Sequence, residues 1–246
     1  MSYQFEICTN SVRSSIAAQK GGANRVELCA AIPEGGTTPS YGEIKLAREL
    51  LNLKLHPIIR PRGGDFLYTE EEIQAMLYDI EMAKQLGADG VVFGCLNKNG
   101  EIDAVVMRKL MKAASGLSVT FHRAFDLCKD PLLALEQIID LGCNRILTSG
   151  QETNAELGIP LLERLNHQSN GRITILAGCG VNETNIKKIA TETGIKEFHF
   201  SARENLPSKM EYKKQTVSMG NEASNEYSIS ITTEERVRRT IKALLS

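Results

Sequence analysis

The sequence predicts an α/β fold of the (β/α)8 TIM-barrel class. Eight short apolar runs of strand type occur along the 246 residues, and a helical stretch follows each of them. Eight such units close into one barrel. The competing doubly wound sheet usually has fewer strands and a glycine-rich first turn, whereas the first turn here is Thr9-Asn10-Ser11-Val12.

The predicted strands are short and are bounded by turn residues. They are Tyr3–Cys8, Arg25–Cys29, Lys54–Arg60, Gly90–Gly94, Ser118–Arg123, Arg145–Ser149, Arg172–Ala177 and Glu197–Ala202. No change of composition marks a boundary between them. We therefore expect a single TIM-barrel domain over residues 1–246.

The helices are predicted from start signals followed by an apolar period of 3.6 residues. Thr69 and Glu72 have the spacing of a capping box at the start of the third helix. Thr38 is expected to be the N-cap of the second helix, with Pro39 at its first position. Three further starts are predicted at Asp130-Pro131, Asn182 and about Thr233.

A weak internal repeat supports the count of eight units. In each copy a glycine ends a helix and a strand follows within a few residues. The copies are Gly22-Ala23-Asn24-Arg25-Val26, Gly87-Ala88-Asp89-Gly90-Val91, Gly142-Cys143-Asn144-Arg145-Ile146 and Gly194-Ile195-Lys196-Glu197-Phe198. They precede strands two, four, six and eight, as a quarter-barrel repeat would.

One long segment, Arg203–Ser230, is predicted to be irregular. It lies between the last strand and the last helix, and it is rich in Lys, Asn, Ser and Glu. Such a segment serves as a lid, as an oligomer contact or as a disordered excursion. It is not a domain boundary, because the final helix is needed to complete the barrel.

The composition argues against several classes of function. The net charge of −1 and the absence of Trp disfavour nucleic-acid binding. No apolar run approaches the roughly 18 residues that a membrane span requires. Met1-Ser2-Tyr3 leads directly into a strand, so we expect a cytoplasmic protein without a leader.

The six cysteines form no C-x-x-C pair, which argues against a structural zinc site. No motif indicates an organic cofactor. Cys8 and Cys29 nevertheless stand at the ends of neighbouring strands, each in a Glu-x-Cys pattern. Adjacent strands lie about 4.8 Å apart, and soft thiolates select Cu(I), so this pair is a candidate metal site. Two packed thiols without a metal are the alternative.

Polar residues collect at the carboxyl ends of the strands, where TIM barrels carry their active sites. Candidate proton carriers are Glu6, Glu27, His122 and Asp126. Candidate anion-binding residues are Arg60, Arg62, Arg123, Gly178, Gly180, Ser201 and Arg203. Buried ion pairs that position the strands are the alternative for the charged residues.

Gly178-Cys179-Gly180-Val181 follows the seventh strand and precedes a helix. Glycines let main-chain N–H groups approach an anion, and the start of a helix adds partial positive charge. The loops after strands seven and eight bind phosphate in many barrels. A tight turn without a ligand is the alternative.

An ordered set of motifs over nearly the whole chain resembles the CutC copper homeostasis family. The motifs are Glu6-x-Cys8, Glu27-Leu28-Cys29, Glu34-Gly35-Gly36-x-Thr38-Pro39-Ser40, Arg60-Pro61-Arg62-Gly63-Gly64-Asp65-Phe66, Gly90-Val91-Val92-Phe93-Gly94, Phe121-His122-Arg123-Ala124-Phe125-Asp126, Arg145-Ile146-Leu147-Thr148-Ser149-Gly150, Phe198-His199-x-Ser201-Ala202-Arg203 and Val217-x-Met219-Gly220. One departure is Cys179, where the family usually has a third glycine between Gly178 and Gly180.

The resemblance implies a cytoplasmic TIM barrel that forms homo-oligomers and takes part in copper homeostasis by binding Cu(I). The first hypothesis is a Cu(I)-handling protein of this type, with Cys8 and Cys29 as thiolate ligands. The resemblance does not supply a reaction. The density of polar groups exceeds what two thiol ligands need. The second hypothesis is therefore an enzyme with lyase or isomerase type acid–base chemistry on a small phosphorylated or carboxylated metabolite.

Overall fold

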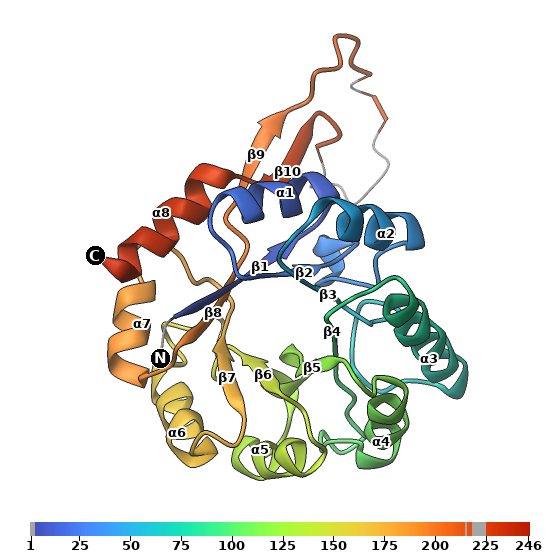
Figure 1. Ribbon diagram of the computed structural model, residues 1–246, viewed down its shortest axis with the longest axis vertical. Coiled ribbons are helices and arrows are strands. Elements are labelled where there is room, and N and C mark those ends of the chain that lie inside the picture. Colours follow the sequence, from blue (N-terminus) through green and yellow to red (C-terminus); the bar gives the residue numbers. More distant parts are fainter. Residues whose placement is uncertain (1–2, 215, 218–224) are drawn as a thin grey trace.

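The computed structural model describes residues 3–214, 216–217 and 225–246. Its centre is a sheet of eight parallel strands in the order β3-β2-β1-β8-β7-β6-β5-β4 (Figure 1). The strands are β1 Gln4–Thr9, β2 Arg25–Leu28, β3 Lys54–Pro57, β4 Gly90–Phe93, β5 Ser118–Phe121, β6 Arg145–Thr148, β7 Thr174–Ala177 and β8 Glu197–Phe200. A parallel bridge between Ile58 and Val92 joins β3 to β4 and closes the barrel. The prediction of a (β/α)8 barrel is confirmed.

A helix follows each of these strands before the next begins, and the helices form a ring around the sheet (Figure 1). They are α1 Val12–Lys20, α2 Tyr41–Leu50, α3 Glu70–Gln85, α4 Ala104–Ala113, α5 Pro131–Asp140, α6 Ile159–Ser169, α7 Ile186–Thr193 and α8 Glu234–Leu245. Two 3-10 turns, Ile32–Glu34 and Arg123–Leu127, lie in the loops after β2 and β5. Among the described residues, no helix is long and apolar enough to cross a bilayer.

The main hydrophobic core lies between the strands and the helices. Alternation along each strand turns every second side chain outward, and Ile7, Val26 and Phe93 are fully buried there. Burying a side chain of this size stabilises the fold by about 1.5–3 kcal/mol. The other side chains of each strand point into the barrel, and this leaves the interior free to hold polar residues.

Two predicted helix starts are wrong by a few residues. The N-cap of α2 is Ser40, which forms a capping box with Glu43, whereas the Thr38 hydroxyl contacts the main chain of Arg60. Helix α7 begins after Asn185; Asn182 instead accepts a hydrogen bond from the main-chain N–H of Thr184 in the preceding turn. In both cases a second polar residue, Ser40 or Asn185, follows the predicted cap and is the N-cap instead. The starts at Thr69, Asp130 and Thr233 are confirmed.

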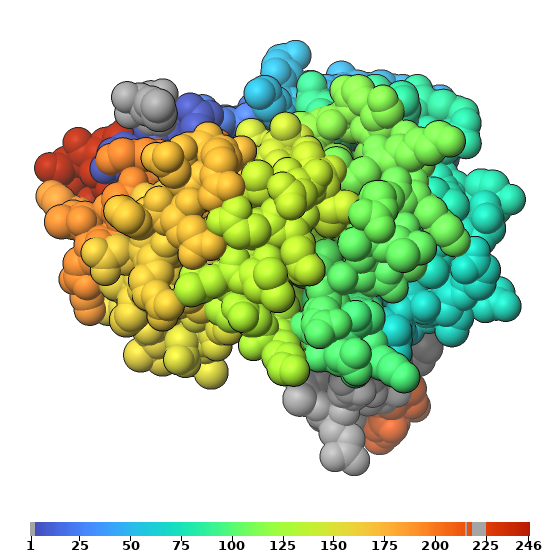
Figure 2. Space-filling view, turned by 90° about the horizontal axis from the view of Figure 1, so that it is seen from below, coloured from blue at the N-terminus to red at the C-terminus, as the bar shows by residue number. Residues whose placement is uncertain are grey.

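The segment expected to be irregular contains an antiparallel pair of strands, β9 Arg203–Pro207 and β10 Ser228–Thr232. The hairpin projects from the barrel beside α1 (Figure 1), and its orange atoms protrude beyond the closely packed outer surface in Figure 2. Its base is anchored to the barrel, because Asn10 Nδ2 donates to the carbonyl of Ser230 and the N–H of Thr232 donates to Ser14 Oγ. Met219 and Gly220 of the Val217-x-Met219-Gly220 motif lie outside the described residues.

Candidate functional site

Strands β1 and β2 place two thiols and a carboxylate together at the carboxyl end of the barrel. Cys8 is the register partner of Glu27, and Cys29 directly follows β2. The sulfur atoms of Cys8 and Cys29 lie 3.9 Å apart, and Cys29 Sγ lies 3.4 Å from Glu27 Oε2. One ligand atom from each of the three residues falls within 4.8 Å of the others. Two soft donors and one oxygen suit a soft metal ion better than a hard one.

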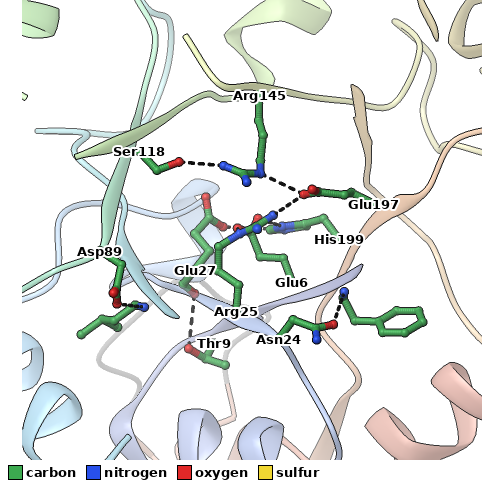
Figure 3. Close-up of polar contacts among 12 residues, drawn as sticks. Glu6, Thr9, Asn24, Arg25, Glu27, Asp89, Ser118, Arg145, Glu197 and His199 are labelled. Carbon is green, nitrogen blue, oxygen red and sulfur yellow. Dashed lines mark hydrogen bonds and ion pairs between the residues drawn. The ribbon is translucent and has the colours of Figure 1, made fainter. Parts of the chain in front are cut away.

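His199 from β8 borders this group on the other side of β1. Its Nδ1 lies 2.8 Å from Glu6 Oε1, and its Nε2 lies 3.6 Å from Glu27 Oε2 (Figure 3). Glu6 is the register partner of His199, so the β1–β8 pairing brings the two together. Glu6 thereby orients the imidazole, in the way that carboxylates orient histidines beside metal sites.

Toward the amino ends of the strands, the barrel interior holds a chain of ion pairs (Figure 3). Arg25 Nε contacts Glu6, and Arg25 Nη2 lies 2.8 Å from Glu197 Oε2. Arg145 pairs with the same oxygen of Glu197 at 2.9 Å and with Ser118 Oγ at 2.7 Å. A buried charge is tolerated only where partners compensate it, so these contacts hold Glu6 in one position.

The environment sets the protonation of the site. Burial alone would raise the pKa of Glu6, but Arg25 and His199 hold this pKa far below its usual value. Burial likewise opposes the charged form of His199, yet hydrogen bonds to Cys8 and Glu6 raise its pKa well above the usual value. Burial raises the pKa of Glu27 to about 8, so this carboxyl is largely protonated at neutral pH.

The two thiols differ in their readiness to ionise. The hydrogen bond from Cys29 lowers the pKa of Cys8, against the effect of burial, and His199 adds to the lowering. The pKa of Cys29 moves the opposite way, because the shared hydrogen bond and burial both favour its thiol form. Cys8 is therefore the sulfur that ionises first.

The structure keeps His122 neutral. Its Nδ1 accepts a hydrogen bond from the N–H of Ala124, and its ring packs on Phe66 with the centroids 4.8 Å apart. Burial, together with the positive charge of Arg60, lowers the pKa of His122 to about 3. Gly94 makes room for the ring, because a Cβ there would lie 2.9 Å from His122 Nδ1. His122 lines the cavity, so it can contact a ligand there, but as an uncharged imidazole.

The polar atoms of Asp126 and Arg60 are hydrogen-bonded to other groups of the protein, most of them in loops. Asp126 accepts hydrogen bonds from Thr148 Oγ1 at 2.5 Å and from the N–H of Ser149 at 3.1 Å, and it also pairs with Arg123. The guanidinium of Arg60 donates to three main-chain carbonyls, those of Glu34, Gly36 and Gly64. These contacts shape the rim and leave little of either group for a ligand.

Two predicted anion-binding residues lie apart from the others. Arg62 is not among the residues that line the cavity, and it pairs with Glu72 and Asp65 at the start of α3. Gly178 allows close packing rather than ligand contact, since a Cβ there would lie 2.4 Å from Leu147 Cδ1. Gly180 does line the cavity.

A cavity of about 630 Å³ opens at this end of the barrel, beside the thiols. This is the size of a small-molecule site. The predicted residues on its wall are Cys8, Arg60, Glu27, His122, Arg123, Asp126, Gly180, Ser201 and Arg203. Arg236 of α8 also lines it, and no sequence motif signalled this residue.

A model of the CutC family matches residues 3–204. The chain belongs to the CutC family. A protein named family protein CutC from Bacteroides thetaiotaomicron is 68% identical over 246 residues and covers 99% of each chain. Its namesake from Parabacteroides distasonis is 59% identical over 239 residues, which are 96% of this chain and 98% of that relative.

Solved structures agree with this family membership. A CutC protein of Streptococcus agalactiae, whose name refers to copper homeostasis, is 37% identical with a TM-score of 0.77, over 81% of this chain and 98% of that chain. Thiamine phosphate pyrophosphorylase from Pyrococcus furiosus is 16% identical with a TM-score of 0.61, over 99% of this chain and 96% of that one. The second likeness shows only that the two share the barrel fold.

Proposed function

We propose that this CutC family member binds Cu(I) through Cys8 and Cys29 and serves copper homeostasis. The observation that carries the proposal is the 3.9 Å separation of the two sulfur atoms. With metal–sulfur bonds of about 2.3 Å, the value for zinc, sulfurs at this separation give an S–metal–S angle of about 115°, which suits a three-coordinate ion. A linear two-coordinate unit would span about 4.6 Å and would require the sulfurs to move apart by about 0.7 Å. Glu27 is placed to offer a third, weaker ligand, with its Oε2 3.4 Å from Cys29 Sγ.

The proposal includes a reducing compartment such as the cytoplasm, where thiols stay unpaired. All six cysteines are free thiols in the structure, which is consistent with that setting. It also includes a homo-oligomer, as the family resemblance implies. Mass measurement in solution tests the assembly, and a strict monomer would contradict it.

The test is an anaerobic Cu(I) titration of the reduced protein against a chromophoric Cu(I) chelator. We expect about one tightly bound Cu(I) per chain and the loss of this binding in Cys8→Ser and Cys29→Ser. Cys143→Ala is a matched control, because this thiol is buried, contacts Met111 and lies outside the cavity wall. Unchanged affinity in the double variant Cys8→Ser/Cys29→Ser would refute the proposal.

A second candidate function is acid–base chemistry on a small phosphorylated or carboxylated metabolite. The observation that favours it is the cavity of about 630 Å³, which is far larger than a metal ion needs. Its proton-transfer groups would be Glu27 and His199, because His122 is neutral and Asp126 is engaged by the loop after β6. Native mass spectrometry of protein isolated under reducing conditions distinguishes a bound metabolite from a bound metal.

A further inference from the structure

The proposed metal site has one accessible side. Cys8 and Glu27 line the cavity, whereas Cys29 is only 1% exposed and is not part of the cavity wall. Beyond Glu27, a further ligand to a metal on these sulfurs would therefore come from a molecule in the cavity. A volume of about 630 Å³ holds a small organic molecule and not merely an ion.

Of the described residues, four arginines line the cavity, against two carboxylates, Glu27 and Asp126. Among its arginines, Arg60 is satisfied by main-chain carbonyls and Arg123 pairs with Asp126. Arg203 lines the same cavity as Cys8, and within the described part of the chain its guanidinium forms no ion pair.

The positive charge of the neighbouring Arg236 is only partly neutralised by a carboxylate. Its Nε lies 3.8 Å from Glu183 Oε2, and its Nη1 donates to the main-chain carbonyl of Arg203 at 2.6 Å. That contact holds the two arginines together on one side of the cavity. A cavity with two such arginines selects an anionic occupant, for which carboxylates are good acceptors.

We propose that the cavity docks a small thiol that carries carboxylate groups and delivers Cu(I) to Cys8 and Cys29. This inference rests on the proposed function, and it adds the chemical class of the copper donor. The donor sulfur faces Cys8, and its carboxylates contact Arg203 and Arg236. Such a donor fits the size of the cavity and matches its positive charge. It also reaches the sulfur pair from the side that is open.

The transfer is a ligand exchange without a change of oxidation state. In the donor complex, Cu(I) lies between the thiolates of two donor molecules, one of which docks in the cavity. Two copper–sulfur bonds to the donor molecules break, and two form to Cys8 and Cys29. The protons of the two protein thiols pass to the two donor sulfurs, which leave as thiols. No oxidant or reductant is needed.

The test compares two donors, the Cu(I) complexes of glutathione and of glutathione diethyl ester, in which ethyl ester groups replace the two carboxylates. Copper on the full-length protein is measured under anaerobic conditions after rapid desalting at a series of times. We expect faster loading from glutathione. Arg203→Gln and Arg236→Gln should each lower the ratio of the two rates by about tenfold, the effect of losing one hydrogen bond between charged groups.

Arg238→Gln is the matched control, because this exposed arginine of α8 pairs with Glu234 and lies outside the cavity wall. It should leave the ratio unchanged. S-methylglutathione provides a test without any variant: as an anionic analogue that cannot hold copper through a thiolate, it should slow loading from the glutathione complex.

The outcomes separate this inference from the function on which it rests. Equal loading from both donors in the wild type, with no effect of S-methylglutathione, would overturn the docking of a carboxylated donor but leave Cu(I) binding intact. Failure to load from either donor would overturn both.

Discussion

Nδ1 of His199 lies 2.8 Å from Oε1 of Glu6, although the two residues are 193 positions apart in the chain. The contact links the ion pairs of the barrel interior to the candidate site, because Glu6 also contacts Arg25. Glu6 is fully buried, so its charge is supported by these partners rather than by water.

Replacing Glu6 by Gln should therefore be strongly destabilising. Among the described residues, Arg25, which is 3% exposed, would then keep one ion-pair partner, Glu197. Breaking a buried ion pair from one side costs about 3–5 kcal/mol. Urea unfolding followed by circular dichroism measures the change. Glu234→Gln, which breaks the exposed pair with Arg238, should cost under about 1 kcal/mol, and equal losses in both variants would contradict the interior role of Glu6.

Gly94 offers a second test of the site architecture. A Cβ at this position would lie 2.9 Å from both His122 Nδ1 and Phe121 Cζ. We expect Gly94→Ala to destabilise the protein by about 1–3 kcal/mol, the usual effect of overpacking a filled interior. Thermal unfolding measures it.

Gly42→Ala is the control for Gly94→Ala. Gly42 lies in α2, and the nearest atom to an added Cβ is 4.0 Å away. Alanine there should stabilise the helix by up to about 1 kcal/mol. A Gly94→Ala variant as stable as Gly42→Ala would show that the His122 ring is free to move.

The fold was predictable because its signals are local. Alternation within each strand and caps such as Thr69 with Glu72 are set by neighbouring residues. The meeting of Cys8 and Cys29 was also predictable, since consecutive parallel strands lie side by side. The β9–β10 hairpin was missed, because the polar composition of this segment gave no strand pattern.

The use of each polar side chain was less predictable. The contact between His199 and Glu6 depends on the register in which β8 closes on β1, which no local pattern encodes. Asp126 and Arg60 have the residue types of a catalytic acid and an anion clamp. The conformations of the surrounding loops instead direct Thr148 and the carbonyl of Gly36 to them.

Asp126→Ala should reveal a role in stability rather than in copper binding. The substitution leaves Thr148 Oγ1 and the main-chain N–H of Ser149 without their acceptor. Each unsatisfied buried group costs about 1–3 kcal/mol. Chemical denaturation should show this loss, while the anaerobic titration still gives wild-type Cu(I) affinity. Loss of copper binding with unchanged stability would assign Asp126 to the site itself.

The raised pKa of Glu27 predicts how stability depends on pH. This pKa is about 8 in the folded protein, against an ordinary value of 4.5 that applies to the unfolded chain. Between these values the folded state binds more protons than the unfolded state, so the carboxyl lowers the free energy of unfolding as pH rises from about 4.5 to about 8.

Glu27→Gln removes that titration while keeping the shape of the side chain. The variant should therefore gain stability relative to the wild type on going from pH 5 to pH 8, by about 2 kcal/mol, since neighbouring groups titrate with it and reduce the full linkage effect. Urea unfolding of both proteins at the two pH values measures the difference. Asp65→Asn is a control, because Asp65 is exposed and pairs with Arg62 outside the cavity. If Glu27→Gln and the wild type kept the same stability difference at both pH values, the carboxyl would be ionised in the folded protein, and its placement as a protonated neighbour of Cys29 would be wrong.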